Sequence, residues 1–149
     1  SEGILAILLA REGFIVTGLD INADALAFAS QLLVQQQEFV QKRVQLIHGD
    51  AQAVVLQPES FDTVILGEVI EHLNRPDLMI ERSHDLLKPS GAIVVTTPFG
   101  YHPDPDHRQT FVLTRFIELF EDRFVPEHLS VEEGYIRFTG RKQTPNDKI

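Results

Sequence analysis

Four short apolar segments constrain the fold more than any other feature, because each ends in a glycine, a proline or an aspartate. They span residues 14–20, 44–50, 61–67 and 92–98. Stretches of helical composition separate most of them along the chain. Continuous apolar runs that alternate with helices are typical of parallel strands buried on both faces. The sequence therefore predicts an α/β fold with a mostly parallel sheet and helices on both of its faces.

The helices expected around these strands span residues 4–12, 23–41, 68–87 and 113–122. Asn22 is placed to accept hydrogen bonds at the start of the second helix. Pro76 interrupts the third helix, since proline removes a backbone donor from a helix interior. The expected helices thus precede the first strand, lie between strands or follow the strand over residues 92–98.

The C-terminal part of the chain has a different pattern. Residues 127–141 contain two strand-like segments around Glu133 and Gly134, which predicts an antiparallel hairpin. We expect one domain over residues 1–142, followed by a frayed tail over residues 143–149.

Composition limits the classes of partner. The 13 Lys and Arg residues against 22 Asp and Glu residues give a net charge of −9, which disfavours general nucleic-acid binding. Cysteine is absent, so disulfides, a thiolate nucleophile and a cysteine zinc site are excluded. The longest apolar run, residues 4–10, is too short to span a bilayer. We expect a cytoplasmic protein with no membrane partner.

Two acidic residues end neighbouring strands and are candidate cofactor ligands. Asp20 is placed to accept hydrogen bonds from two ribose hydroxyls, in NAD or in S-adenosylmethionine. Asp50 can accept the exocyclic amine of adenine. A helix cap or a surface acid explains either residue equally simply. The nature of the cofactor therefore stays open at this point.

Four motifs, in their order along the chain, resemble those of a known protein family. Residues 18–22, 48–52, 61–73 and 86–98 are similar in order and spacing to class I S-adenosylmethionine-dependent methyltransferases. The chain most resembles the branch that contains the ubiquinone-biosynthesis O-methyltransferases, over nearly its whole length. The resemblance implies a Rossmann-like methyltransferase sheet with S-adenosylmethionine as the cofactor. It also implies cofactor contacts by Gly3, Asp20, Ile21, Asp50, Ala51, Gly67 and Glu68.

The chain departs from the family pattern at its start. The family places a strand and a glycine-rich loop before the first helix, and only Ser1 to Gly3 correspond to that region. We expect the first strand and most of the loop to be missing. On this expectation the chain as it stands binds the cofactor weakly and can be inactive.

A cluster of acids and histidines suggests a metal. On a helix, Glu68, Glu71 and His72 would share one face, where they could hold Mg²⁺ or Mn²⁺. His107 is the expected fourth ligand, and His102 competes for that role. The alternatives are a structural role or contacts with cofactor and substrate, since acids also stabilise a helix N-terminus without metal.

Methyl transfer to oxygen also needs a group that removes the proton of the hydroxyl, and His72 and His107 are the candidate catalytic residues. We expect O-methylation of a small-molecule hydroxyl. Metal-dependent 2′-O-methylation of an RNA 3′ end is a more specific alternative. The methyltransferase branch with that activity has a similar Glu-x-x-Glu-His motif and a similar histidine motif later in the chain. A nicotinamide-dependent oxidoreductase and a non-catalytic methyltransferase-like module are the remaining alternatives.

Overall fold

The computed structural model describes residues 3–148, which divide between Val55 and Leu56 into two compact units. Residues 3–55 form the first unit and residues 56–148 the second. The dividing point lies inside the domain expected over residues 1–142, and that single domain stays a prediction. Ser1 and Glu2, at the start of the resemblance, lie outside the described residues.

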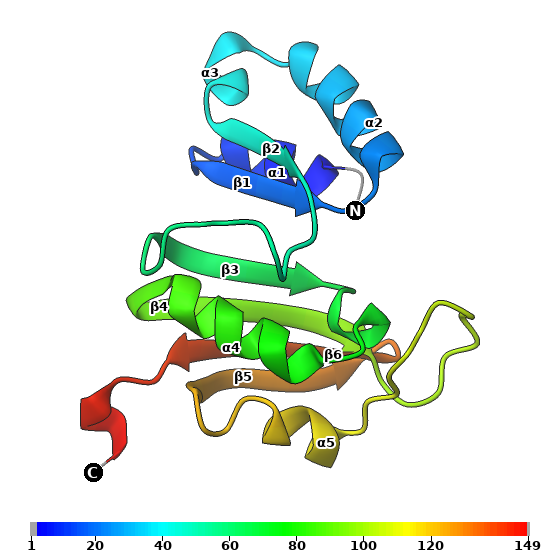
Figure 1. The fold of residues 1–149 in the computed structure, drawn as a ribbon, viewed down its shortest axis with the longest axis vertical. Helices are drawn as coiled ribbons and strands as arrows, with labels where there is room; N and C mark the ends of the chain where they lie inside the picture. The colour runs from blue at the N-terminus through cyan, green and yellow to red at the C-terminus, as the bar shows by residue number, and fades with distance from the viewer. Residues whose placement is uncertain (1–2, 149) are drawn as a thin grey trace. The chain divides into compact units, whose positions relative to one another are not determined.

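The first unit contains a two-stranded parallel sheet and three helices (Figure 1). Strands β1 and β2 pair in register from Val16 and Val44 to Asp20 and His48. The elements in chain order are α1 (Ile4–Arg11), β1 (Val16–Asp20), α2 (Ala23–Val34), α3 (Glu38–Gln41) and β2 (Val44–His48).

Helix α2 starts where the sequence predicted and ends earlier. The Asn22 side chain accepts hydrogen bonds from the backbone N–H groups of Asp24 and Ala25, so the predicted cap is confirmed. The single helix expected over residues 23–41 is wrong. Helix α2 ends at Val34, because the Gln41 side chain donates to the main-chain oxygens of Val34 and Gln36 and so occupies the end of the helix.

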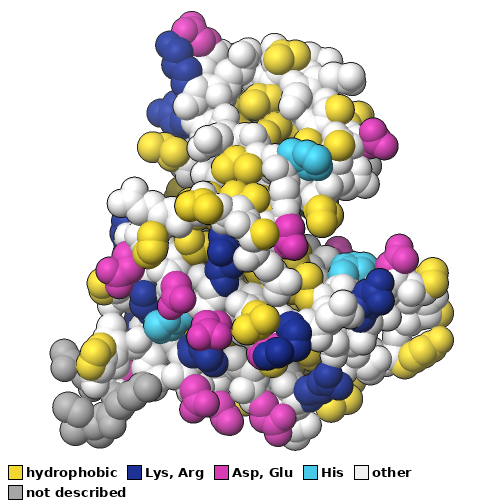
Figure 2. All heavy atoms as spheres, viewed as in Figure 1, with side chains coloured by type: hydrophobic (Ala, Val, Ile, Leu, Met, Phe, Trp, Pro, Cys, Tyr) yellow, Lys and Arg dark blue, Asp and Glu magenta, His cyan; other side chains and the backbone are white. Residues whose placement is uncertain are grey.

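The core of the first unit is small. Ile7, Ala10 and Val40 are buried together. The partly buried side chains that pack against them are Val16, Leu32, Leu33 and Val44. Large hydrophobic side chains such as Ile15 and Val34 remain exposed. Figure 2 shows hydrophobic side chains at the surface of this unit.

The second unit is built on a four-stranded sheet with the order β3-β4-β6-β5. Strands β3 and β4 are parallel, and β6 pairs antiparallel with both β4 and β5. Its elements are β3 (Phe61–Gly67), the one-turn 3-10 helix η1 (Ile70–His72), α4 (Pro76–Leu86), β4 (Leu87–Pro98), α5 (Leu113–Glu118), β5 (Phe124–Glu132), β6 (Tyr135–Lys142) and the 3-10 helix η2 (Pro145–Lys148).

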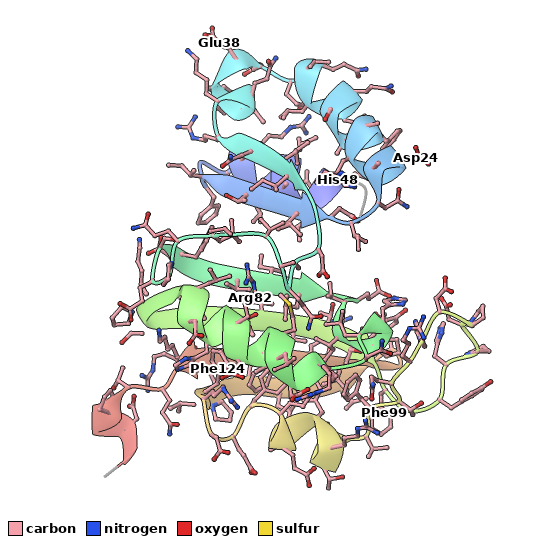
Figure 3. All side chains as sticks on the ribbon, viewed as in Figure 1. Asp24, Glu38, His48, Arg82, Phe99 and Phe124 are labelled. Atoms are coloured by element: carbon pink, nitrogen blue, oxygen red, sulfur yellow. The ribbon has the colours of Figure 1, made fainter. Side chains whose placement is uncertain are left out.

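The predicted C-terminal hairpin is confirmed. Glu133 and Gly134 form its turn, and both have positive φ angles, of 53° and 81°. The hairpin packs on an aromatic cluster, in which Phe116 and Phe120 of the α5 region contact Phe138 of β6. Phe124, at the start of β5, contacts Phe120 (Figure 3). This cluster fixes α5 and the segment before it against the sheet.

Both described sheets have edge strands that pair on one side only, and β1 and β3 are two of them. Strand β1 pairs only with β2 among the described strands, and β3 pairs only with β4. The described residues begin with the turn that leads into α1. The expected first strand is therefore not among the elements that residues 3–148 form.

Gly3 is required by two separate features of its position. Its φ angle is +70°, and a Cβ atom there would lie 2.3 Å from the Cβ of Ala29. We expect Gly3→Ala to lower the free energy of unfolding by more than about 1 kcal/mol. Urea denaturation followed by circular dichroism measures the change.

Gly13→Ala is the matched control, since Gly13 has a φ angle of +99° and nothing within 4 Å of the added Cβ. It carries the backbone strain without the steric clash, so its cost should be smaller. Adding Ala29→Gly to Gly3→Ala should restore part of the loss. Equal costs for the two glycine substitutions would contradict the role of the contact with Ala29.

Candidate functional site

The chain leaves β3 through a strained residue, Glu68. Glu68 has a φ angle of +53°, and its backbone N–H donates a hydrogen bond to the Thr96 oxygen (2.9 Å). This bond continues the pairing of β3 with β4 by one residue. The helix predicted over residues 68–87 is therefore wrong at its start, and Glu68 does not share a helix face with Glu71 and His72. The α-helix begins only at Pro76, where proline is favourable in a first turn.

Glu71 is a buried carboxylate, and only one of its two side-chain oxygens is hydrogen-bonded. Its side chain is on η1, and the residue is only 1% exposed. Oε2 accepts a hydrogen bond from the hydroxyl of Thr97 on β4 (2.9 Å), whereas Oε1 is buried without a hydrogen-bond partner in the protein. Since buried polar atoms are nearly always paired, Oε1 is able to accept a further hydrogen bond or to bind a cation.

The segment between β4 and α5, residues 99–112, is held against η1 by its backbone. Phe99 begins this loop at the end of β4 (Figure 3). The N–H groups of Arg108 and Gln109 both donate to the main-chain oxygen of Glu71, at 2.8 and 3.0 Å. The Gln109 side chain also donates to the Leu73 oxygen. These bonds fix the neighbouring His107 beside η1.

The structure brings Glu71, His72 and His107 together. Each offers one donor atom, and the three atoms lie within 4.8 Å of one another. The His72 and His107 rings meet edge to face, with centroids 4.8 Å apart. His72 Nδ1 lies 3.2 Å from the Asp106 oxygen, so its Nδ1–H can donate there and leave Nε2 for a ligand. Glu68 is not part of this group.

Tyr135 is a site residue that the sequence did not single out. The negative charge of Glu68 raises the pKa of Tyr135, with burial, a hydrogen bond to the Glu68 side chain and the charge of Glu71 as further causes. Tyr135 starts β6 and pairs with Pro98 at the end of β4. A placement of the hairpin beside β4 would have found it, since that pairing brings Tyr135 to the ends of β3 and β4.

Four candidate cofactor residues of the first unit lie at or just after the carboxyl ends of β1 and β2, namely Asp20, Ile21, Asp50 and Ala51. Asp20 ends β1, and Asp50 follows β2, whose last residue pairs with Asp20. Gly49 N–H donates to the Asp20 main-chain oxygen, and His48 Nε2 lies 3.0 Å from the Ile21 oxygen (Figure 3). This arrangement places Ile21 and Asp50 near each other, as expected for parallel strands that end together.

Both acids also have a local structural role. Asp20 Oδ1 accepts from the N–H of Asn22, and Asp50 Oδ1 accepts from the N–H of Gln52. Each is a turn in which a side chain bonds the backbone two residues later. Ile21 is 69% exposed and Ala51 is partly buried. The cofactor roles of these residues stay predictions, as do those of Gly3, Gly67 and Glu68.

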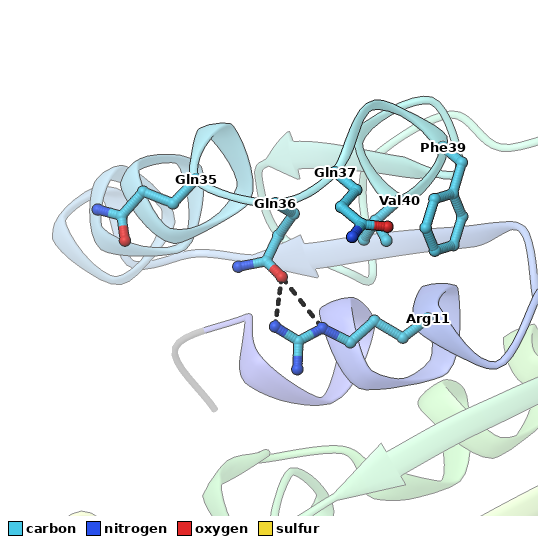
Figure 4. Close-up of a pocket in the computed structure, with 6 residues that line it drawn as sticks. All are labelled: Arg11, Gln35, Gln36, Gln37, Phe39 and Val40. Carbon is cyan, nitrogen blue, oxygen red and sulfur yellow. Dashed lines mark hydrogen bonds between the residues drawn. The ribbon is translucent and has the colours of Figure 1, made fainter.

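A cavity of about 490 Å³ lies elsewhere in the first unit. Its lining residues are Arg11, Gln35, Gln36, Gln37, Phe39 and Val40. The Arg11 guanidinium donates to Gln36 Oε1 inside it (Figure 4). No residue of the predicted cofactor set lines this cavity, so it is not the candidate cofactor site.

Comparison with known proteins identifies the class. Residues 1–95 match a family described as a methyltransferase domain, and the chain belongs to this family. The ubiquinone biosynthesis O-methyltransferase of Klebsiella pneumoniae is 33% identical over 98 residues, which cover 64% of this chain and 38% of that protein. That of Coxiella burnetii is 30% identical over 95 residues, covering 64% and 39%. The chain thus spans about two fifths of the length of these relatives.

Solved structures show the fold. A Pyrococcus horikoshii protein has a TM-score of 0.79 at 21% identity, covering 95% of this chain and 78% of its own. An S-adenosylmethionine-dependent methyltransferase from Methanosarcina mazei scores 0.78 at 19% identity, covering 95% and 88%. The cyclase SpnF scores 0.83 at 17% identity, covering 96% and 72%. The predicted Rossmann-like α/β methyltransferase fold is confirmed.

The helices formed by residues 3–148 include none with the length and apolar character that crossing a membrane requires.

The hydrogen bond from Thr97 to Glu71 should matter for stability. Thr97→Val keeps the shape of the side chain and leaves the Glu71 carboxylate without that donor. We expect the free energy of unfolding to fall by about 1–3 kcal/mol, because a buried polar group loses its partner. Thr96→Val, on the same strand and only half-buried, is the control. Urea denaturation distinguishes them, and an unchanged Thr97→Val protein would contradict this role.

Proposed function

We propose that the protein is an S-adenosylmethionine-dependent methyltransferase that acts on the hydroxyl group of a small molecule. Membership of the methyltransferase domain family over residues 1–95 carries the proposal. The similar proteins are named ubiquinone biosynthesis O-methyltransferases, which supports oxygen as the acceptor atom. A cytoplasmic location and a small-molecule partner remain predictions that accompany it.

In this proposal the ends of β1 and β2 bind the adenosine part of the cofactor. Asp20 would accept hydrogen bonds from the ribose hydroxyls, with Ile21 beside the adenine. Asp50 and Ala51 would contact the adenine edge. Their common position at one end of a parallel sheet supports this role, since ligands of open α/β sheets bind at the carboxyl ends of the strands.

The reaction is an in-line displacement at the methyl carbon. S-adenosylmethionine, when bound, would supply the methyl group, whose carbon would bond to the acceptor oxygen as the bond to sulfur breaks and leaves a neutral thioether. The hydroxyl proton must leave, and a neutral imidazole of His72 or His107 can accept it. The proximity of these two rings to buried Glu71 supports this assignment, because a nearby carboxylate stabilises the imidazolium that forms.

As an alternative to general-base action by a histidine, we propose that Glu71, His72 and His107 hold a divalent cation. The unpaired Oε1 of Glu71 and the hydrogen-bonded Nδ1 of His72 fit this group, since ligating histidines commonly donate their other N–H to a carbonyl. Two nitrogen donors and one carboxylate suit Mn²⁺ better than Mg²⁺, which prefers oxygen. A bound cation would lower the pKa of an acceptor hydroxyl.

The same three residues favour a second function, metal-dependent 2′-O-methylation of an RNA 3′ end. The net charge of −9 counts against an RNA partner. The family match gives no support to the nicotinamide-dependent oxidoreductase. Measurements of cofactor binding and of turnover would distinguish an enzyme from a non-catalytic methyltransferase-like module.

Cofactor binding tests the main proposal. Isothermal titration calorimetry with S-adenosylhomocysteine should show binding that Asp20→Ala weakens at least about tenfold, because two ribose hydrogen bonds are lost. Asp24→Ala, an exposed acid in the first turn of α2, is the control and should leave the affinity unchanged. No binding by the full-length protein that contains this chain, or equal affinity for its Asp20 variant, would overturn the proposal.

The cation has its own test. In a His102→Ala background, which removes the neighbouring loop histidine, Mn²⁺ binding followed by electron paramagnetic resonance should be retained. Adding His72→Ala should weaken it at least about tenfold. Adding His128→Ala instead, on the exposed face of β5, should not. If the His72 and His128 variants bind Mn²⁺ alike, Glu71, His72 and His107 do not hold it.

A further inference from the structure

The loop between β4 and α5 contains a second group of donor atoms, which shares His107 with the first group. His102, Asp104 and His107 each offer one donor atom, and these atoms lie within 4.8 Å of one another. The loop is the yellow-green segment that leaves β4 in Figure 1. The proposed methyltransferase reaction uses His107 but neither His102 nor Asp104, so these two side chains have no part in it.

Asp104 is held in place before any ligand arrives. Pro103 and Pro105 flank it and restrict the backbone on both sides. The His107 N–H donates to the Asp104 main-chain oxygen (3.2 Å), and the Asp106 N–H donates to Asp104 Oδ1 (2.9 Å). One carboxylate oxygen is thus fixed by the backbone, which is how ligating carboxylates are commonly oriented.

The other carboxylate oxygen points to His107. Asp104 Oδ2 lies 3.7 Å from His107 Nε2. Two ligands of one tetrahedral zinc ion, each about 2.0–2.2 Å from it, lie about 3.4 Å apart. A small side-chain rotation would therefore let both atoms bind one ion.

His102 completes the group, and its ring lies beside that of His107. Its ring and that of His107 have centroids 4.9 Å apart and planes inclined by 32°. His102 is exposed, whereas the His107 side chain is only 11% exposed.

We propose that His102, Asp104 and His107 bind a borderline divalent transition metal ion, such as Zn²⁺ or Co²⁺, without Glu71 or His72. Two imidazoles and one carboxylate are the donors that such ions prefer. The ion ties the two ends of the turn at residues 102–107 to each other. It also occupies Nε2 of His107, so an ion at Glu71 and His72 has only Nδ1 of the same ring to use. Metal binding by His102, Asp104 and His107 does not depend on the proposed methyltransferase function.

The test removes His72 from the group of Glu71, His72 and His107 and measures whether the protein still binds Zn²⁺. His72→Ala protein should retain one equivalent of Zn²⁺ after equilibrium dialysis with elemental analysis. His72→Ala/His102→Ala and His72→Ala/Asp104→Asn should each bind Zn²⁺ at least about tenfold more weakly. Asparagine keeps the Oδ1 that accepts from Asp106, so the second variant removes charge and preserves the turn.

His72→Ala/His128→Ala is the matched control and should bind Zn²⁺ as His72→Ala does, since His128 lies on β5 outside both groups. Co²⁺ absorption bands in His72→Ala should disappear in the His102 and Asp104 variants and persist in the control. Circular dichroism confirms that each variant folds. The proposal is overturned if His72→Ala binds no zinc, or if loss of His102 or Asp104 leaves its affinity unchanged.

Discussion

The arrangement of the second unit depends on one buried residue, Glu71. Its side chain accepts a hydrogen bond from Thr97 of β4, and its main-chain oxygen accepts two more from the loop that follows β4. The same residue therefore ties η1 to the sheet and the loop to η1. A buried carboxylate is costly unless it is paired, so the position is one that a purely structural residue would not require. The packing of the second unit does not explain why the buried Oε1 of Glu71 has no hydrogen-bond partner in the protein.

Fold and chemistry are separate conclusions for this protein. The cyclase SpnF shares the fold with a TM-score of 0.83, although its name denotes a different reaction from methyl transfer. A Rossmann-like sheet thus provides strand ends at which ligands bind, and the side chains there determine the chemistry. In the first unit the candidates for such side chains are Asp20 and Asp50, and in the second unit the candidate is Glu71. The acids suit a nucleoside, and Glu71 with its two histidines suits proton transfer or a cation.

The strands were predictable from sequence, but the start of the third helix was not. Apolar runs that end in Gly, Asp or Pro carry a local signal, and all four expected strands occur within a few residues of their expected bounds. The segment after Gly67 carries helix-forming residues, and its local pattern favoured a helix. The hydrogen bond from Glu68 to Thr96 instead continues the sheet, and a bond between residues that far apart has no local signature.

The sequence by itself determined the class of fold, the family and the residues worth attention, because strand ends, motif order and residue types are local properties. Only the tertiary structure decided which of those residues meet. It placed Glu71, His72 and His107 together and left Glu68 outside that group, since backbone hydrogen bonds bring a loop more than thirty residues downstream onto η1. It also revealed Tyr135 and Thr97, whose positions follow from strand register. Register depends on pairing across the sheet, which no single segment specifies.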